Sequence, residues 1–169
     1  IVVLMLGGAR RVSMGELLIN SGKRLGYNVE ILSYELDCCA PIAAIGTVII
    51  GRKWQDPHVV EHIVETVKRF GVNIILPFVD GAIAVASECK RLLPDVFIPV
   101  SEEDIATAMF DKALAAKLFA EKDIAIPSTY SFDECRFPAI PKPRLGSASK
   151  GIKVINDTKE LKQLQNPAQ

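Results

Sequence analysis

The sequence predicts an α/β protein in which a doubly wound parallel sheet is followed by a smaller α+β unit. Over residues 1–100, short apolar runs alternate with segments of helical periodicity about every twenty residues, which is typical of consecutive β–α–β units. Beyond residue 101 the alternation gives way to two successive helices and then to extended runs. We therefore expect two domains, residues 1–105 and residues 106–169.

The first domain is predicted to open with a strand. Residues 1–6, "IVVLML", form a continuous apolar run that ends at two glycines, as a strand buried on both faces does. In residues 13–25 apolar side chains recur at helical spacing, and Gly26 follows as a helix stop. Further strands are expected at residues 28–34, 46–51, 72–78 and 95–100, and further helices at residues 56–71 and 80–93.

Two of these helices open on an aspartate. Asp56 precedes Pro57, so the aspartate is expected to be the N-cap, with the proline at the first helical position. Asp80 directly follows an apolar strand and opens the next helix. It is either an N-cap or a residue of a ligand crevice at the strand ends, and the two roles are compatible.

The second domain is predicted to begin with helices and to end in a small antiparallel sheet. Residues 101–109 carry a Ser-x-x-Asp cap signature, and residues 111–123 read as a second helix capped by Asp111. Extended runs follow at residues 128–132, 137–142 and 151–156, and a last helix opens at Asp157.

Composition excludes several classes of protein. The chain carries 20 basic and 20 acidic residues, so it has no overall field that would draw it to nucleic acid or to an anionic membrane. No apolar run reaches the ~18 residues of a membrane span, and the opening run lacks the flanks of a signal peptide. We expect a cytoplasmic protein.

Because the chain begins without Met and stops in a polar segment, we also expect it to be a piece of a longer protein.

The four cysteines show no sign of forming disulfide bonds. They show neither C-x-x-C spacing nor the density of a disulfide scaffold, and we expect reduced, structural thiols. These residues are Cys38, Cys39, Cys89 and Cys135.

Arginines follow the first predicted strand, where a doubly wound fold has its ligand crevice. Arg10 and Arg11 could clamp a carboxylate or phosphate through their planar guanidinium groups, or they could simply be solvated. A dinucleotide fingerprint would need glycines at positions 7, 9 and 12, but Ala9 and Val12 stand at two of them. A nicotinamide-dependent oxidoreductase therefore loses its main support.

Two further motifs fail on inspection. The segment "LINSGKR" lacks both the first glycine and the final hydroxyl residue of a phosphate-binding P-loop. His58 and His62 are four apart on a predicted helix, but Val59 stands where a zincin has glutamate. A solvated helix face is the favoured interpretation of the two histidines.

A lysine and a loop of small residues stand near the end of the chain. In residues 137–151, "FPAIPKPRLGSASKG", an apolar run ends at Lys142 and leads into glycines, serines and a second lysine. Such a loop can fold over phosphates with its backbone N–H groups, and a lysine can add a point charge. Most glycine–serine hairpin loops bind nothing, so this signal alone is moderate.

The order of these segments carries a resemblance. "DKALAAKLFAEKDIAIPSTY" followed by "FPAIPKPRLGSASKG" resembles the front of an ATP-grasp domain. Residues 7–43 and 77–87 resemble the Rossmann-like pre-ATP-grasp domain of proteins similar to the large subunit of carbamoyl-phosphate synthase. The resemblance covers essentially the whole chain, and its C-terminal part is the more specific.

The resemblance implies an ATP-dependent carboxylate–amine ligase that activates an acid as an acyl phosphate. Its partners would be ATP, Mg²⁺, a carboxylate and an amine, and a homodimer is one admissible assembly. Two lysines would contact ATP phosphates, and the loop after the second would close over the triphosphate. The implied nucleotide-binding residues are Lys112, Lys142, Gly146, Ser147, Ser149, Lys150 and Gly151, and the candidate substrate-binding residues are Arg10, Arg11 and Asp80.

Departures from the family pattern limit these expectations. Pro141 replaces the usual apolar β-former, and proline cannot donate to a sheet ladder. Ala148 stands where a further glycine is common. The family's Mg²⁺ ligands and adenine hinge belong to a later part of the domain, so we assign no catalytic residue and no metal ligand here. We expect the fragment alone to be inactive, and the alternative is a non-catalytic module that binds a nucleotide or small acid.

Overall fold

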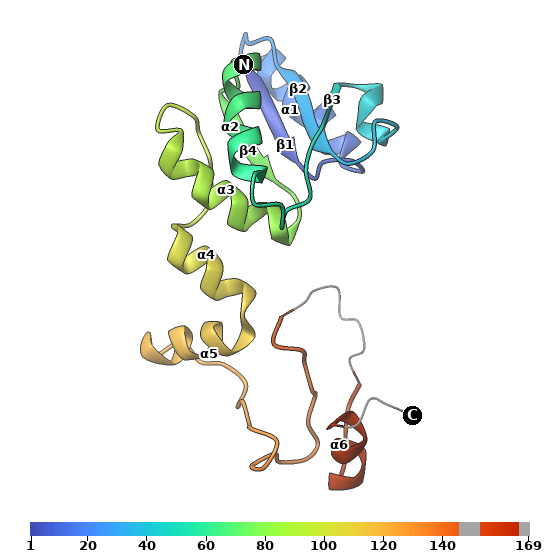
Figure 1. Cartoon of the computed structure of the whole chain (residues 1–169), viewed down its shortest axis with the longest axis vertical. Helices are drawn as coiled ribbons and strands as arrows, with labels where there is room; N and C mark the ends of the chain where they lie inside the picture. Colours follow the sequence, from blue (N-terminus) through green and yellow to red (C-terminus); the bar gives the residue numbers. More distant parts are fainter. Residues whose placement is uncertain (146–152, 166–169) are drawn as a thin grey trace. The chain divides into compact units, whose positions relative to one another are not determined.

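The computed structural model describes residues 1–145 and 153–165 (Figure 1). The chain divides into two compact units, Ile1–Thr107 and Ala108–Gln169.

The first unit is built on a four-stranded parallel sheet. Its strands are β1 (Val2–Leu6), β2 (Glu30–Glu35), β3 (Thr47–Ile50) and β4 (Ile74–Pro77). They lie in the order β3-β2-β1-β4, and every pairing is parallel. The order reverses beside β1, so the sheet is doubly wound, as the sequence predicts.

Strand β1 is buried on both faces because its side chains alternate between two cores. Leu4 and Leu6 belong to one core, whereas Val3 and Met5 belong to the other, and all four side chains are at most 1% exposed. This explains the continuous apolar run in the sequence, since both faces of a parallel strand are covered by helices.

Helices cover the two faces of the sheet. On the face of Leu4, α2 (Val59–Phe70) and α3 (Asp80–Leu92) supply the packing partners. On the other face lie α1 (Val12–Arg24) and a short 3₁₀ helix, η1 (Pro41–Ala44), which the sequence pattern did not predict. Figure 1 shows the helices on both sides of the strands.

Two expectations for the first unit are wrong in detail. The strand predicted at residues 95–100 is reduced to one parallel bridge between Phe97 and Ile74, which lies in β4. Asp56 is not the N-cap of α2, because that helix begins at Val59 and His58 is its cap. The Asp56 carboxylate instead accepts the His58 N–H at 2.8 Å, within the turn that leads into the helix.

The second unit contains little regular structure beyond its helices. Helix α4 (Glu103–Phe110) runs across the division between the two units, so only its last residues belong to the second. Helix α5 (Lys112–Glu121) follows, and α6 (Thr158–Gln165) comes last among the described residues. The predicted antiparallel sheet is reduced, over the described residues, to one bridge in which Ala139 and Ile155 exchange two backbone hydrogen bonds of 2.9 and 2.8 Å. The segment 128–132, which was predicted to be extended, forms no β-sheet pairing with any other described residue.

The cysteines are free thiols, but they are not alike. Cys89 is fully buried in the larger core, and burial raises the pKa of its thiol to about 12, so it is a structural residue as expected. Cys38 and Cys39 are exposed, which contradicts a structural role for them.

Within the described part of the chain, no helix is both long and apolar enough to cross a bilayer.

Truncating the central strand should cost much of the first unit's stability. We expect Leu4→Ala to lower the free energy of unfolding by about 2–5 kcal/mol, because a fully buried leucine leaves a cavity. Urea unfolding followed through the single tryptophan, Trp54, would measure it. Leu25→Ala is the matched control, since that side chain is 74% exposed and its truncation should change little. Equal losses for the two variants would contradict the packing described.

Candidate functional site

A crevice lies at the carboxyl edge of the parallel sheet, where β1, β2 and β3 end. Its volume is about 750 Å³. Parallel α/β sheets bind their ligands at this edge, because the loops that leave the strands converge there. The lining residues come from the end of β2, from the loops after the three strands and from the start of α3: Gly7, Ala9, Arg10, Arg11, Tyr34, Glu35, Leu36, Asp37, Cys39, Ala40, Pro41, Arg52, Lys53, Trp54, Gln55 and Val79.

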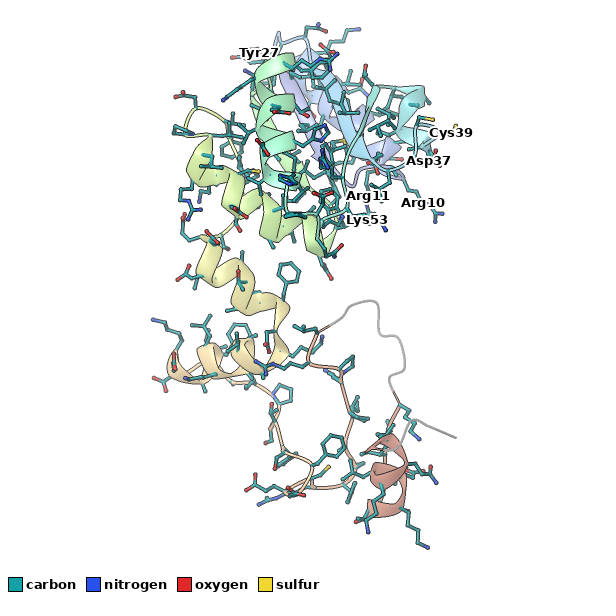
Figure 2. The ribbon with its side chains drawn as sticks, in the orientation of Figure 1. Arg10, Arg11, Tyr27, Asp37, Cys39 and Lys53 are labelled. Carbon is teal, nitrogen blue, oxygen red and sulfur yellow. The ribbon has the colours of Figure 1, made fainter. Side chains whose placement is uncertain are left out.

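Cations predominate among the charged groups of this crevice. Four basic side chains and two acidic ones line it, and Arg52 is also paired with Asp56 at 3.3 Å. Among the described residues, no ion pair engages Arg10, Arg11 or Lys53. Figure 2 shows these three side chains on the same side of the first unit. The crevice therefore favours an anionic ligand.

Of the three predicted substrate-binding residues, two line the crevice and one does not. Arg10 and Arg11 do so, from the loop after β1. Asp80 is the first residue of α3, and Val79, which does line the crevice, is the N-cap. The N-cap interpretation of Asp80 is wrong, because its carboxylate already lies within the first turn and makes no cap hydrogen bond.

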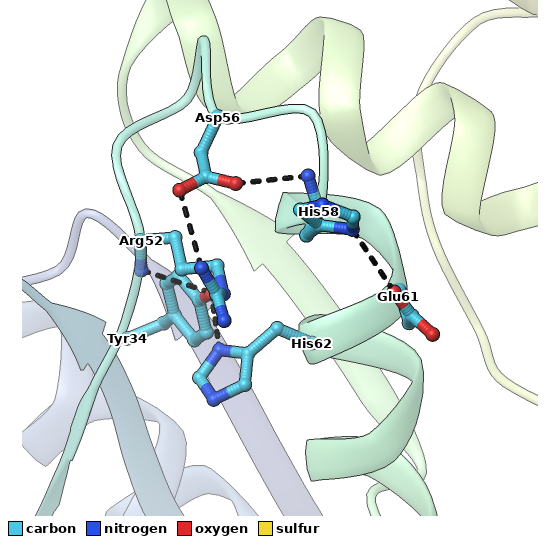
Figure 3. A network of polar contacts seen from close by, with 6 residues as sticks. All are labelled: Tyr34, Arg52, Asp56, His58, Glu61 and His62. Atoms are coloured by element: carbon cyan, nitrogen blue, oxygen red, sulfur yellow. Dashed lines mark hydrogen bonds and ion pairs between the residues drawn. The ribbon is translucent and has the colours of Figure 1, made fainter.

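A buried tyrosine holds the loop after β3 in place (Figure 3). The Tyr34 hydroxyl accepts the backbone N–H of Arg52 at 3.0 Å and lies 2.7 Å from Nδ1 of His62. The phenol offers one proton and two lone pairs, so it pairs with Nδ1 in either tautomer of His62 while it accepts the Arg52 N–H. Burial raises the pKa of Tyr34, which keeps the hydroxyl protonated.

Aromatic packing completes the arrangement around Tyr34. The rings of Tyr34 and Trp54 are tilted with centroids 5.8 Å apart, so the indole of the crevice rests on the tyrosine. Gly51 lets the backbone before Arg52 pass close to the tyrosine ring, since a Cβ there would lie 2.1 Å from Cε1 of Tyr34. Tyr34 thus fixes both the backbone that carries Arg52 and the ring of Trp54.

The two histidines do not form a pair. His58 is exposed and lies 3.3 Å from Glu61, as a solvated helix face implies. His62 is partly buried, and its Nδ1 is occupied by Tyr34. The expectation of a solvated face therefore holds for His58 and is wrong for His62, whose partner lies 28 residues away in the sequence.

In the second unit, the segment that follows Lys142 is fastened to the start of α5. Asp111 caps that helix as predicted, accepting the N–H groups of Ala113 and Leu114 at 3.0 and 3.2 Å. Its other oxygen accepts from Nε of Arg144 at 2.6 Å. The Arg144 carbonyl in turn accepts the Lys112 N–H at 3.1 Å.

These contacts bring together the chain segments that carry the two predicted phosphate-binding lysines. Lys112 is the first residue of α5, and Lys142 lies two residues before Arg144; both side chains are exposed. The remaining predicted nucleotide-binding residues lie outside the described residues: Gly146, Ser147, Ser149, Lys150 and Gly151.

Opposing effects act on the Asp111 carboxyl. Burial raises its pKa, but the hydrogen bonds from Leu114, Arg144 and Ala113 together lower it below its usual value. The ionised form therefore predominates at neutral pH and supports both the helix cap and the pairing with Arg144.

Sequence reasoning missed several residues of these sites. Arg52, Lys53 and Trp54 lie two to four residues after the end of β3, so their position near a strand end was an available signal. Arg144 comes two residues after Lys142, and its pairing with the predicted cap Asp111 had no signal in the sequence.

Comparison with known proteins identifies the fold. No protein-family model matches the sequence, and no curated protein matches it. Among solved structures, the L-amino acid ligase from Bacillus licheniformis matches with a TM-score of 0.69 and 12% identity, over 96% of this chain and 41% of that one. N5-carboxyaminoimidazole synthetase from Staphylococcus aureus, complexed with ADP, matches with 0.67 and 17%, over 96% and 43%.

A third match comes from a carboxylase. The biotin carboxylase domain of Hydrogenobacter thermophilus 2-oxoglutarate carboxylase, in complex with MgADP, ADP and bicarbonate, gives a TM-score of 0.66 and 17% identity, over 98% of this chain and 40% of that one. The chain thus spans about two fifths of the length of these three proteins. It has the α/β fold of the N-terminal part of ATP-grasp proteins, which confirms the predicted class; the matches do not single out carbamoyl-phosphate synthase.

Removing the Tyr34 hydroxyl should loosen the loop after β3. We expect Tyr34→Phe to destabilise the first unit by about 1–3 kcal/mol, because the Arg52 N–H and His62 Nδ1 lose their partner. Urea unfolding and the Trp54 emission maximum would measure the change. Tyr27→Phe is the control, since Tyr27 is 57% exposed. If Tyr34→Phe behaved like the control, the hydroxyl would have no such role.

The start of α5 should weaken in acid. Because the folded-state pKa of Asp111 is lowered, its stabilisation is present above the unfolded value of about 3.9 and is lost as pH falls through the folded value. NMR hydrogen exchange of the Ala113 and Leu114 amides should show protection falling in that range. Asp111→Asn keeps a capping side chain without the charge, so its protection should vary little with pH. Identical pH profiles for the two proteins would contradict the assignment.

Proposed function

We propose that the chain is the N-terminal part of an ATP-dependent carboxylate–amine ligase of the ATP-grasp type. The observation that carries the proposal is the fold, which matches about two fifths of the length of an amino acid ligase, a synthetase and a biotin carboxylase domain over at least 96% of this chain. In this proposal residues 1–105 are the Rossmann-like pre-ATP-grasp domain, and residues 106–169 begin the ATP-grasp domain. The full enzyme activates a carboxylate as an acyl phosphate, which an amine then attacks.

The nucleotide is proposed to bind through the second unit. Two of the α5 N-terminal amides are taken by Asp111, so the positive charge for the phosphates comes from Lys112 and Lys142. The contacts between Arg144 and residues 111–112 support this role, because they fasten the Lys142 segment beside the start of α5. Lysine ammonium groups beside the β- and γ-phosphates would stabilise charge during transfer. Gly146, Ser147, Ser149, Lys150 and Gly151 are the proposed covering loop.

ATP supplies the phosphoryl group in this proposal, and Mg²⁺ accompanies it. ADP and MgADP are present in structures of two of the matched proteins. The exposed lysines Lys112 and Lys142 fit an anionic phosphate chain, whereas we assign none of the Mg²⁺ ligands to this chain. Without those ligands we propose that these residues alone do not complete the reaction.

The acid is proposed to bind in the crevice of the first unit. Arg10 and Arg11 line it without an ion-pair partner among the described residues, and planar guanidinium groups suit a carboxylate. Asp80 does not line the crevice but directly follows the lining residue Val79, and it stays a proposed substrate contact on the strength of that position alone.

Narrower parts of the proposal rest on the sequence. The closer kinship to the large subunit of carbamoyl-phosphate synthase depends on the segments at 7–43 and 77–87. A cytoplasmic location is proposed from the sequence pattern alone. A homodimer is proposed because one of the matched structures is described as a domain dimer.

Lys142 provides the direct test. In the longest chain that its gene encodes, Lys142→Ala should weaken ATP binding about tenfold or more, since a phosphate contact with a cation is removed. Isothermal titration calorimetry with ATP and Mg²⁺ would measure the affinity. Lys122→Ala, at the far end of α5, is the matched control and should bind as the unaltered protein does.

Turnover separates the ligase from a binding module. A panel of carboxylates and amines should yield substrate-dependent ADP and phosphate from the same long chain. ATP binding without any such release would favour the non-catalytic module. Unchanged affinity in Lys142→Ala would refute the assignment of that lysine.

A further inference from the structure

Three potential metal ligands follow one another in the loop after β2. Asp37, Cys38 and Cys39 each offer one ligand atom, and these atoms all lie within 4.8 Å of one another. All three residues are exposed, and Asp37 and Cys39 also line the crevice, so a solvent ion can reach them. Figure 2 shows Asp37 and Cys39 close together on the side of the unit that also carries Arg10.

The sulfur positions match a particular coordination geometry. The Sγ atoms of Cys38 and Cys39 are 3.8 Å apart. Two thiolates on a tetrahedral Zn²⁺, each at about 2.3 Å from the metal, are separated by about 3.8 Å. An ion can therefore be seated between the two sulfurs without moving either of them. The Asp37 carboxylate has to come closer by about 1 Å at most to join them, since Zn–O bonds are about 2.0–2.2 Å long.

The loop is fastened near both sides of these residues. On one side it continues from β2, which pairs with two strands. On the other, Ala40 is 5% exposed, Ile42 is fully buried, and the Ile42 N–H donates to the Ala9 carbonyl at 3.0 Å. The Asp37 carboxylate also accepts the Cys39 N–H at 2.8 Å. Much of the conformational entropy that ligand binding would otherwise cost is thus already lost on folding.

We propose that Asp37, Cys38 and Cys39 bind one thiophilic divalent cation, Zn²⁺ in the first instance, with the fourth coordination position open to solvent. On binding, each thiol releases its proton to the buffer, so two thiolates and one carboxylate surround the cation. Three protein ligands and one open position are the arrangement of zinc sites that accept an exogenous ligand. The open position lies at the edge of the crevice that Asp37 and Cys39 line.

This site is separate from the nucleotide chemistry proposed above. Mg²⁺ prefers oxygen ligands in octahedral geometry and does not favour thiolates, so the ion that accompanies ATP would not occupy it. The inference therefore stands or falls independently of the ligase proposal.

Metal titration of the full chain tests the proposal. With the thiols kept reduced by a phosphine, Cd²⁺ should produce a thiolate-to-metal charge-transfer band in the ultraviolet that saturates at one ion per chain. Zn²⁺ should displace Cd²⁺ and abolish the band, whereas excess Mg²⁺ should not. Calorimetry with Zn²⁺ should give the same stoichiometry.

Single substitutions identify the ligands. Cys38→Ser and Cys39→Ser should each abolish stoichiometric binding, and Asp37→Asn should weaken it while the band remains. Cys135→Ser is the matched control, since that thiol lies in the second unit, and it should leave the titration unchanged. An unchanged Trp54 emission spectrum would show that each variant is folded.

Three outcomes would overturn the proposal. The first is the absence of a band or of heat at equimolar metal in the unaltered chain. The second is binding that persists in both cysteine variants. The third is saturation at one ion per two chains, which would show thiols of separate molecules sharing the metal.

Discussion

The first unit depends on the burial of β1 on both faces. Leu4 and Leu6 enter one core, Val3 and Met5 enter the other, and the strand pairs with β2 and β4 on either side. From β1 the chain builds the sheet in one direction through β2 and β3, and β4 lies on the other side. The loop after β1 therefore leaves the sheet at the point where the strand order reverses. That is why Arg10 and Arg11 come to lie in the crevice, as their position directly after the first predicted strand indicates.

Local sequence patterns predicted the fold well wherever the structure of a segment depends mainly on its own residues. The apolar run at 1–6 became β1, and Asp111 became the cap of α5, because burial on both faces and a side-chain cap each leave a local signature. Residues 95–100 were overpredicted, since only Phe97 meets a neighbouring strand. The extended runs of the second unit were overpredicted for the same reason, as the Ala139–Ile155 bridge is their one ladder contact among the described residues.

The sites were less predictable because they are made by distant residues. The sequence pattern places His62 on a solvated helix face, whereas in the structure its Nδ1 is hydrogen-bonded to the hydroxyl of Tyr34, 28 positions earlier. Arg144 reads as part of a polar loop until Asp111 is found beside it. Strand ends could be located from the sequence, and with them Arg10 and Arg11, but the contacts of Tyr34 with Arg52 and His62 could not. Both sites therefore combine a predictable place in the fold with partners that only tertiary structure identifies.

The Asp111–Arg144 pair has a consequence for the order of folding. It joins residues 33 positions apart, and between α5 and Arg144 no regular secondary structure forms. Closing a chain of that length costs roughly 3 kcal/mol plus a constant in entropy. Helix α5 needs only local hydrogen bonds, whereas the segment around Lys142 cannot dock until that cost has been met. The two lysines would then be brought together late in folding, after the helix that carries the first of them has formed.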